Sequence, residues 1–571
     1  MKKFILFLIS AFLLTGCLLN ENQQTERYFD HFPQWDTLIA DYQKRYPTVD
    51  KYLKSDTSEA QKVVEVDWED ELHLFKLADI NRLNLIPKYS IDTLQGNLSG
   101  TTTYRFKALK TDTRVQLAEY TFNDNNEWED VHFVKSTENA AFETQQELWF
   151  TKNLNYRVVS RQKVNQVFDA QLIVEGHPVG TEREYLGILE IDQEHVVQFF
   201  MYRQGDSERT DQWFVQNGKE RIALESKFGA SDSNVLKFPI FHSELRYFTK
   251  GDTLMGWWYN FDKGKDYKMK FLATPYMKSR LLDEKLDGEP QAISGKWEVS
   301  FTDSDGDYPA IGIFEQKGNL IYGTFVTETG DYRHLEGFLA NDNDAGEGQR
   351  LYLNTMDGAH AFHFNAVLRD DSLVDGNFLS GTHYKATWSA RKSQNAALRD
   401  PSALTFLKAG YESFSFEFPN LNREPVSLNQ PKFEDQVVLV SITGTWCPNC
   451  KDETEYLKQV YKKYSTAGLE VVALQFERSE DFETAKAAVE KANEDLPVPY
   501  TQLIAGKAGA QSAAEKLPML NQIMSYPTLI VLNREHEVEK IHTGFYGPGT
   551  GEYYTEFTSE MDSLITRLLK D

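Results

Sequence analysis

A short segment near residue 440 constrains the fold of this chain more than any other feature. Residues 437–443 (VVLVSIT) form a continuous apolar run, which is typical of a strand buried on both faces of a sheet. Residues 444–450 (GTWCPNC) follow, and the next side chains, up to residue 464, place apolar and aromatic groups at helical spacing. Pro448 suits the first position of a helix, where its missing N–H costs nothing. The sequence therefore predicts a buried strand that turns directly into a helix, with Cys447 and Cys450 at the turn.

These cysteines are placed for thiol–disulfide exchange. Unpaired N–H groups and the helix dipole favour a thiolate at a helix N-terminus, so Cys447 is the expected nucleophile, exposed to substrate. Cys450 is turned toward the interior and lies close enough to form a disulfide with Cys447 and to resolve a mixed disulfide. Asp452 and Glu453 add negative charges that oppose a thiolate, and Lys451 offsets only one of them. We therefore expect a Cys447 pKa less depressed than in strongly oxidising proteins.

Other uses of a Cys-x-x-Cys pair stay open at this point. Half of a zinc site needs further ligands, and because the sequence has no second Cys-x-x-Cys motif, we predict no metal site. An inert structural disulfide is a second alternative, although closing so short a loop gains little stability. A peroxiredoxin is disfavoured because its reactive cysteine normally lacks a partner three residues later.

The downstream segments complete an alternating α/β pattern. Strands are expected at 469–477, 500–504, 526–532 and 538–542, and helices at 481–493, 510–523 and 553–569. This order, with Cys-x-x-Cys opening the first helix, resembles thioredoxin. The residues that carry a closer resemblance are the motif 446–450, Tyr526-Pro527-Thr528 and Glu477 at a strand end. On these, residues 413–571 resemble the TlpA/ResA type of membrane-tethered thiol–disulfide oxidoreductase.

The resemblance implies roles for residues beside the cysteines. In that family the proline at the position of Pro527 is cis and packs beside the disulfide, and the backbone before it pairs with an extended substrate. A carboxylate at the position of Glu477 lies near the cysteines and assists their proton transfers. Tyr526 is bulkier than the usual residue there, which leaves substrate preference open. The resemblance implies no cofactor. The residues with implied roles are Cys447, Cys450 and Glu477 in catalysis, and Trp446, Tyr526 and Pro527 in substrate binding.

The N-terminus has the pattern of an export signal. Lys2 and Lys3 precede an apolar run over residues 4–14, which is too short to span a bilayer. Residues 14–17 (LTGC) resemble a bacterial lipobox, which implies cleavage before Cys17 and acylation of that residue. We therefore predict a lipoprotein signal peptide over 1–16 and a tether over 17–30, with the protein anchored to a membrane of the cell envelope and facing the periplasm or the exterior. The alternative is an ordinary cleaved signal with an incidental cysteine.

The region between the tether and the cysteines has a different pattern. Short alternating segments separated by Gly, Asp and Asn indicate antiparallel sheet. We predict an N-terminal β-rich domain with a leading helix over 31–180, and an antiparallel sandwich or barrel-like domain over 181–392. Gly295-Lys296-Trp297 resembles the opening of lipocalin-like barrels, and the alternative is a tryptophan that packs the floor of a sandwich. A linker is expected over 393–412.

The chain is thus predicted to be multidomain, with a C-terminal α/β thioredoxin fold after antiparallel β-rich domains. Its 86 acidic and 61 basic residues give a net charge of −25, which argues against a nucleic-acid partner. The expected function is reduction of protein disulfides outside the cytoplasm through a Cys-Pro-Asn-Cys dithiol, with protein thiols and a membrane electron donor as partners. The alternative is a binding or scaffold lipoprotein whose β-rich regions recognise a ligand or protein.

Overall fold

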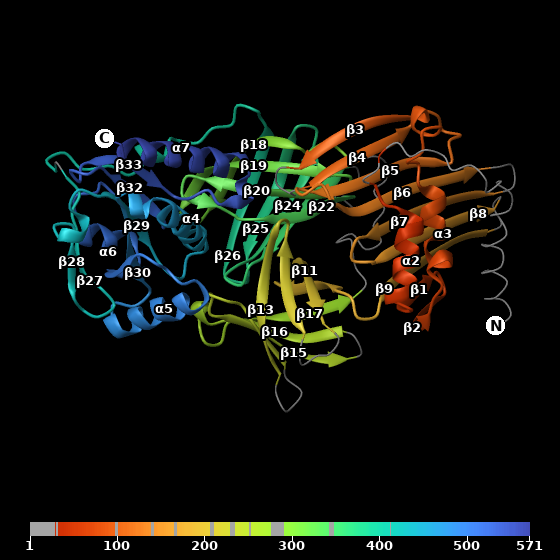
Figure 1. The fold of residues 1–571 in the computed structure, drawn as a ribbon, viewed down its shortest axis with the longest axis horizontal. Coiled ribbons are helices and arrows are strands. Elements are labelled where there is room, and N and C mark those ends of the chain that lie inside the picture. Colours follow the sequence, from red (N-terminus) through yellow and green to blue (C-terminus); the bar gives the residue numbers. More distant parts are fainter. Residues whose placement is uncertain are drawn as a thin grey trace. The chain divides into compact units, whose positions relative to one another are not determined.

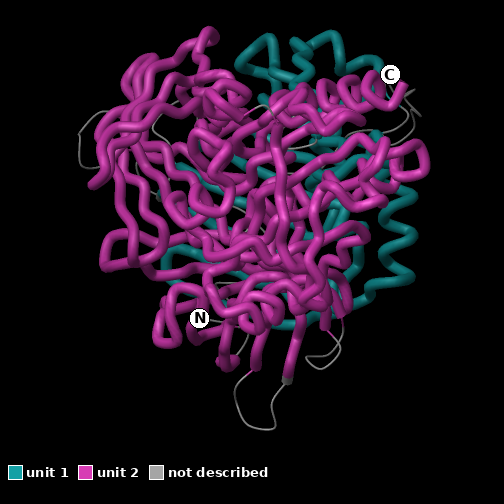
Figure 2. The backbone as a smooth tube through the Cα atoms, turned by 90° about the vertical axis from the view of Figure 1, so that its left-hand side faces the viewer, with its two compact units in different colours: residues 1–95, 101–179 teal, residues 96–100, 180–571 magenta. Residues whose placement is uncertain are grey.

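The computed structural model describes residues 29, 32–96, 101–138, 142–164, 168–205, 211–228, 234–250, 253–275, 290–341, 348–411 and 413–570. The chain forms two compact units, residues 1–95 with 101–179, and residues 96–100 with 180–571 (Figure 2). The predicted signal peptide 1–16, Cys17 and all of the tether except residue 29 lie outside the described residues.

The first unit contains a nine-stranded sheet in the order β2-β1-β9-β8-β7-β6-β5-β4-β3 (Figure 1). Its helices are α2 (Trp35–Arg45) and α3 (Trp68–Ala78). Its strands are β1 (Thr48–Ser55), β2 (Ser58–Glu65), β3 (Tyr89–Gly96), β4 (Thr101–Ala108), β5 (Val115–Asn123), β6 (Trp128–Glu138), β7 (Glu143–Thr151), β8 (Tyr156–Val164) and β9 (Phe168–Pro178).

The helices and the sheet share one aromatic core. In α3, Trp68, Leu72 and Phe75 recur at steps of three or four residues and are fully buried, because side chains at that spacing lie on one helix face. In β6, Val131 and Phe133 are buried while the intervening side chains are only partly covered. The sheet is open with helices packed on its buried face, so this region is neither a sandwich nor a barrel.

The second unit begins with a closed antiparallel barrel of strands β10 to β17. Its interior is filled by a hydrophobic cluster that includes Trp213, Leu245 and Trp258. The strands are β10 (Arg183–Glu190), β11 (Val196–Gln204), β12 (Gln212–Asn217), β13 (Glu220–Phe228), β14 (Asn234–Lys237), β15 (Ser243–Lys250), β16 (Thr253–Asn260) and β17 (Lys268–Pro275).

A second barrel follows in the same unit. The sheet order β19-β18-β26-β25-β24-β23-β22-β20-β21 closes because β19 also pairs with β20. Trp297 is fully buried, and its indole N–H donates to the Ile293 carbonyl at 2.8 Å. Barrels, and not a sandwich, therefore occupy the region 181–392. The strands are β18 (Gly295–Asp303), β19 (Gly306–Lys317), β20 (Leu320–Thr327), β21 (Gly330–Asp331), β22 (Leu335–Asn341), β23 (Gln349–Met356), β24 (Ala361–Arg369), β25 (Ser372–Ser380) and β26 (Tyr384–Lys392).

The C-terminal region has the predicted thioredoxin fold. Its sheet has the order β31-β30-β29-β32-β33, in which β29, β30 and β31 are parallel to one another and β32 is antiparallel to both of its neighbours, β29 and β33. The strands are β27 (Glu417–Pro419), β28 (Pro425–Ser427), β29 (Val437–Thr443), β30 (Leu469–Glu477), β31 (Thr501–Lys507), β32 (Thr528–Leu532) and β33 (Val538–Thr543). The helices are α4 (Pro448–Tyr464), α5 (Phe482–Asp495), α6 (Ala510–Lys516) and α7 (Glu552–Leu568).

Strand β29 is buried on both faces, as its apolar run predicts. Val437 and Leu439 contribute to a core shared with α4 and α7, whereas Val438 and Val440 contribute to a core on the other face that includes α6. Part of the expected linker joins this domain: the Lys408 amide donates to the Met519 carbonyl at 2.8 Å. Burial on both faces fixes the position of β29, and the two cysteines follow this strand at the start of α4.

Two adjacent tryptophans of β16 provide a test of barrel packing. Trp258 is fully buried, whereas Trp257 is 36% exposed, because neighbouring strand residues point to opposite faces. We expect Trp258→Ala to lower the free energy of unfolding by about 3–5 kcal/mol and Trp257→Ala to lower it much less. Urea unfolding of the full chain, followed by circular dichroism, measures both. Equal losses for the two variants would contradict a barrel filled by Trp258.

Candidate active site

The two cysteines lie where β29 turns into α4. Cys447 is the capping residue of α4, and the backbone N–H of Cys450 donates to the Cys447 Sγ atom at 3.2 Å. Pro448 occupies the first helical position, as its missing N–H allows. The sulfur thus partners one of the N–H groups that a helix leaves unpaired at its start. This is the geometry that the strand-to-helix pattern predicts.

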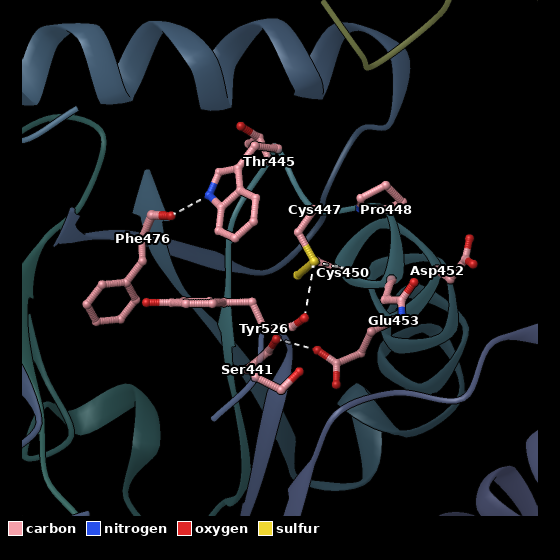
Figure 3. The surroundings of a disulfide bond; sticks show 12 residues. Ser441, Thr445, Cys447, Pro448, Cys450, Asp452, Glu453, Phe476 and Tyr526 are labelled. Carbon is pink, nitrogen blue, oxygen red and sulfur yellow. Dashed lines mark hydrogen bonds between the residues drawn. A yellow bond between two sulfur atoms is a disulfide. The ribbon is translucent and has the colours of Figure 1, made fainter. Parts of the chain in front are cut away.

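Cys447 and Cys450 form a disulfide (Figure 3). Cys450 is 1% exposed, as expected for the inner cysteine, but Cys447 is only 6% exposed. The expectation of an exposed nucleophile is therefore wrong in this state of the molecule. The Cys447 Sγ atom also lies 3.3 Å from the Tyr526 carbonyl oxygen, so the chain segment at Tyr526 borders the disulfide directly.

Tyr526 borders the disulfide through its carbonyl oxygen, and Trp446 and Pro527 are the chain neighbours of Cys447 and Tyr526. The Tyr526–Pro527 peptide bond is cis. The Tyr526 ring contacts the Trp446 ring, with centroids 5.4 Å apart, and the Trp446 indole N–H donates to the Phe476 carbonyl at 2.9 Å (Figure 3). These contacts hold two large aromatic side chains in place beside the sulfur atoms.

Glu477 ends strand β30 and is buried. Its carboxylate accepts two hydrogen bonds from Thr445, one from the backbone N–H at 2.9 Å and one from the hydroxyl at 2.8 Å. Burial raises the pKa of Glu477, although the Thr445 hydrogen bonds act in the opposite direction. Glu477 therefore holds the turn that leads into Cys447. Its part in proton transfer stays a prediction from the family resemblance.

A second buried carboxylate, Glu453, was not recognised as a site residue from the sequence. It lies on α4 three residues after Cys450, and residues at that spacing share a helix face. One carboxylate oxygen accepts a hydrogen bond from the Ser441 hydroxyl, and the other has no hydrogen-bond partner among the described residues. Burial raises the pKa of Glu453 to about 8. The three-residue spacing from Cys450 is the feature of the sequence that could mark Glu453 as a site residue. The burial of its carboxyl group depends on packing against β29, which the spacing does not reveal.

Two interactions offset the negative charges expected in the first turn. Glu453 is neutral near pH 7 because its pKa is about 8. Asp452 forms an ion pair with Arg333 of the second barrel, with 2.6 Å between Oδ2 and Nη1. The sequence pattern could not reveal Arg333 as a partner because it lies 119 residues away in the chain. The expected weak depression of the Cys447 pKa stays a prediction from the sequence.

Metal-binding clusters and membrane-spanning helices are both absent from the described residues. Within those ranges, no group of three or more His, Cys, Asp or Glu side chains is arranged to hold a metal ion. Among the helices of the described chain, none combines the length and the apolar composition that crossing a bilayer requires. Cys17, the predicted lipidation site, lies outside these ranges.

Comparison with known proteins identifies the C-terminal region. Residues 408–554 match the protein-family model described as Redoxin. The thiol-disulfide oxidoreductase ResA of Halalkalibacterium halodurans is 26% identical over 142 residues, which cover 24% of this chain and 69% of that protein. The thioredoxin-like protein YneN of Bacillus subtilis is 28% identical over 138 residues, covering 24% of this chain and 73% of that protein. ResA of Bacillus thuringiensis is 31% identical over 68 residues, and the chain spans only 38% of its length.

Solved structures of similar proteins overlap a comparable share of the chain. The thioredoxin domain of a thiol-disulfide oxidoreductase from Bacteroides vulgatus is 22% identical, with a TM-score of 0.21, and the match covers 27% of this chain and 99% of that one. A thiol:disulfide interchange protein of the thioredoxin family from Chlorobium tepidum is 17% identical, with a TM-score of 0.21. That match covers 28% of this chain and 95% of the other protein.

The C-terminal region is therefore a thioredoxin-like thiol–disulfide oxidoreductase domain, similar to proteins of the ResA type, and it follows β-rich domains in the same chain. The family match lies in this region. It favours a redox function over the alternative of a binding or scaffold protein.

The buried Glu453 carboxyl should make stability depend on pH. The folded chain keeps a proton there up to about pH 8, whereas a carboxyl with the ordinary pKa of 4.5 loses it earlier, so the free energy of unfolding should fall as the pH rises from 4.5 to 8. We expect Glu453→Gln to be more stable than the wild type at pH 8, with a smaller difference at pH 5. Urea midpoints at both pH values measure this. Glu455→Gln, at a half-exposed position on the same helix, is the control. An unchanged pH dependence in Glu453→Gln would contradict the raised pKa.

Proposed function

We propose that this protein is a membrane-anchored thiol–disulfide oxidoreductase that reduces disulfides of other proteins outside the cytoplasm. The observation that best supports this chemistry is the Cys447–Cys450 pair at the N-terminus of α4, beside the Tyr526–Pro527 peptide. A sulfur at a helix N-terminus is stabilised as a thiolate by the N–H groups and the helix dipole. Cys447 is thus the nucleophile, and Cys450 resolves the intermediate.

The proposed reaction begins with both cysteines reduced. The Cys447 thiolate attacks one sulfur of the substrate disulfide, forms a mixed disulfide and releases the other substrate sulfur as a thiolate. The Cys450 thiol then loses its proton and attacks the Cys447 sulfur, which forms the Cys447–Cys450 disulfide and releases the second substrate thiolate. Two electrons pass to the substrate. A dithiol donor, which we place in the membrane, must reduce the pair again before the next cycle.

Proton transfer in this cycle is assigned to the buried carboxyl groups. Glu453, with a pKa of about 8, can exchange a proton at neutral pH, and it lies one turn after Cys450 on the same helix. We assign to its ionised form, the minor form at pH 7, the role of accepting the proton that Cys450 loses. Both oxygens of Glu477 are engaged by Thr445, which supports a role in holding the turn before Cys447 as well as the assistance that the family resemblance implies.

Substrate binding and location complete the proposal. We assign Trp446, Tyr526 and Pro527 to the rim at which a polypeptide substrate docks, because the Tyr526 carbonyl lies beside the Cys447 sulfur and the Trp446 ring packs against the Tyr526 ring. Cys17, as an acylated first residue, anchors the chain to a membrane of the cell envelope, and the described domains face the periplasm or the exterior. These assignments rest on the sequence patterns and on the resemblance to ResA-type proteins.

A trapping experiment tests the proposed chemistry. In Cys450→Ser the mixed disulfide on Cys447 can no longer be resolved, so we expect it to accumulate covalent adducts with proteins of the cell envelope. Non-reducing electrophoresis followed by mass spectrometry identifies them. Cys447→Ser is the matched control and should accumulate far fewer adducts. If the adducts are equally frequent in both variants, or absent from both, Cys447 is not the attacking sulfur of a protein disulfide reductase.

A further inference from the structure

A segment of the second barrel lies across the active-site face of the C-terminal domain. We call residues 329–333 the covering segment; it includes β21 (Gly330–Asp331) and lies between β20 and β22. Three parts of the C-terminal domain bind it: Asn449 between the cysteines, Ser525 next to Tyr526, and the loop 544–547 after β33. Asn449 lies two residues after Cys447, and Ser525 precedes Tyr526, whose carbonyl oxygen lies 3.3 Å from the Cys447 sulfur.

The contacts are made largely with the backbone of the covering segment. The Ser525 hydroxyl donates to the Thr329 carbonyl at 2.5 Å, and the Asn449 side-chain amide donates to the Asp331 carbonyl at 3.3 Å. The Gly547 N–H donates to the Asp331 carboxylate at 2.5 Å. Gly544 lies so close that an added Cβ would come within 2.9 Å of the Thr329 carbonyl carbon. Polar groups around the disulfide are thus already engaged by a polypeptide backbone.

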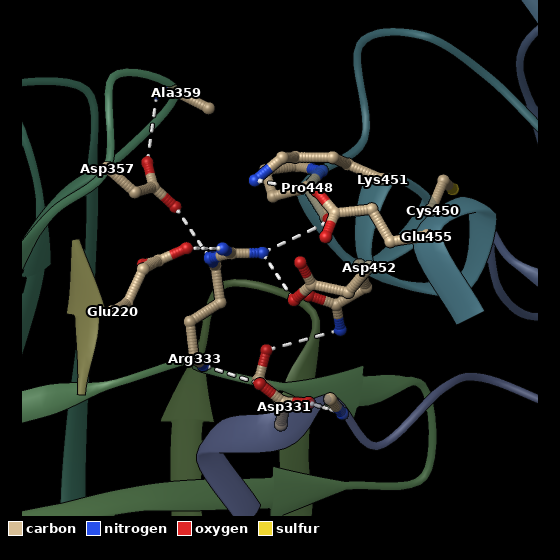
Figure 4. Close-up of polar contacts among 12 residues, drawn as sticks. Glu220, Asp331, Arg333, Asp357, Ala359, Pro448, Cys450, Lys451, Asp452 and Glu455 are labelled. Atoms are coloured by element: carbon tan, nitrogen blue, oxygen red, sulfur yellow. Dashed lines mark hydrogen bonds and ion pairs between the residues drawn. The ribbon is translucent and has the colours of Figure 1, made fainter. Parts of the chain in front are cut away.

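Arg333 ends the covering segment and fastens it. Its guanidinium is almost fully buried and forms ion pairs with Asp452 of α4, Glu220 of the first barrel and Asp357 of the second barrel (Figure 4). It also donates to the Pro448 carbonyl at 3.2 Å, within the Cys-x-x-Cys motif itself. A buried cation is tolerated only with such partners, so losing it leaves buried carboxylates uncompensated. Arg333 therefore links the position of the covering segment to the first turn of the active-site helix.

We propose that the covering segment is an intramolecular competitor for the substrate site, and that an extended polypeptide must displace it to reach Cys447. This rests on the proposed function and adds its regulation and the class of substrate. Extended peptides are commonly bound through main-chain hydrogen bonds, and the covering segment offers its carbonyl groups in that way to Ser525 and Asn449. It also agrees with the low exposure of Cys447. A small disulfide needs less of this face than a polypeptide does.

The test compares two oxidants of the fully reduced full chain, insulin as a polypeptide disulfide and oxidised glutathione as a small one. We expect Arg333→Gln to raise the rate constant with insulin at least about fivefold, the lower end of usual coupling between sites, and to change the rate with glutathione much less. The matched control is Arg423→Gln, which removes an exposed ion pair with Glu483 on the same domain and should change neither rate.

The outcomes separate this proposal from the proposed function. If a folded Arg333→Gln chain reduces insulin no faster than the wild type while glutathione reacts with both, the covering segment is not a competitor. If neither oxidant reacts with any of the chains, the reductase function itself fails.

A second measurement applies if Arg333→Gln does not fold. In Cys450→Ser, a cysteine-containing peptide is attached to Cys447 as a mixed disulfide, and amide hydrogen exchange of residues 329–333 is compared with that of the unmodified variant. We expect faster exchange in the covering segment when the peptide is attached. Equal exchange in both states would overturn the proposal.

Discussion

The active site depends on one capping interaction, in which the sulfur of Cys447 accepts the Cys450 N–H at the start of α4. A helix leaves its first N–H groups unpaired, and here a cysteine side chain partners one of them. Strand β29, buried on both faces, fixes the chain just before this point, and Glu477 fixes the intervening turn through Thr445. The position and reactivity of the sulfur are thus consequences of how the strand and the helix are joined.

The second barrel also contacts helix α4, through Arg333. Arg333 brings carboxylates of the two barrels and of α4 together around one buried cation. The barrels are therefore more than spacers in front of a redox domain, because one of them supplies the charge that neutralises Asp452 in the first turn of α4. The family match covers only residues 408–554. The ion pairs of Arg333 are a physical reason for the chain to include the barrels as well.

Local patterns predicted what depends on local structure. The apolar run of β29, Pro448 at a helix start and the alternating segments before residue 392 each determine their element largely by themselves, and the structure has those elements. Closure into barrels depends on pairing between distant strands such as β18 and β26, so the sequence left sandwich and barrel open. The low exposure of Cys447 and the Arg333 ion pairs arise from contacts between segments far apart in the chain, and the burial of Glu453 arises from packing of α4 against β29. No short pattern encodes them.

The reduction potential of Cys447 and Cys450 shows whether the two cysteines form a reducing dithiol. The full chain is equilibrated in glutathione buffers of graded potential, and the alkylated cysteines are identified by mass spectrometry. We expect one two-electron transition at Cys447 and Cys450, at a potential near that of thioredoxin, about −270 mV. A potential as oxidising as about −120 mV, or a pair that never exchanges with glutathione, would contradict it.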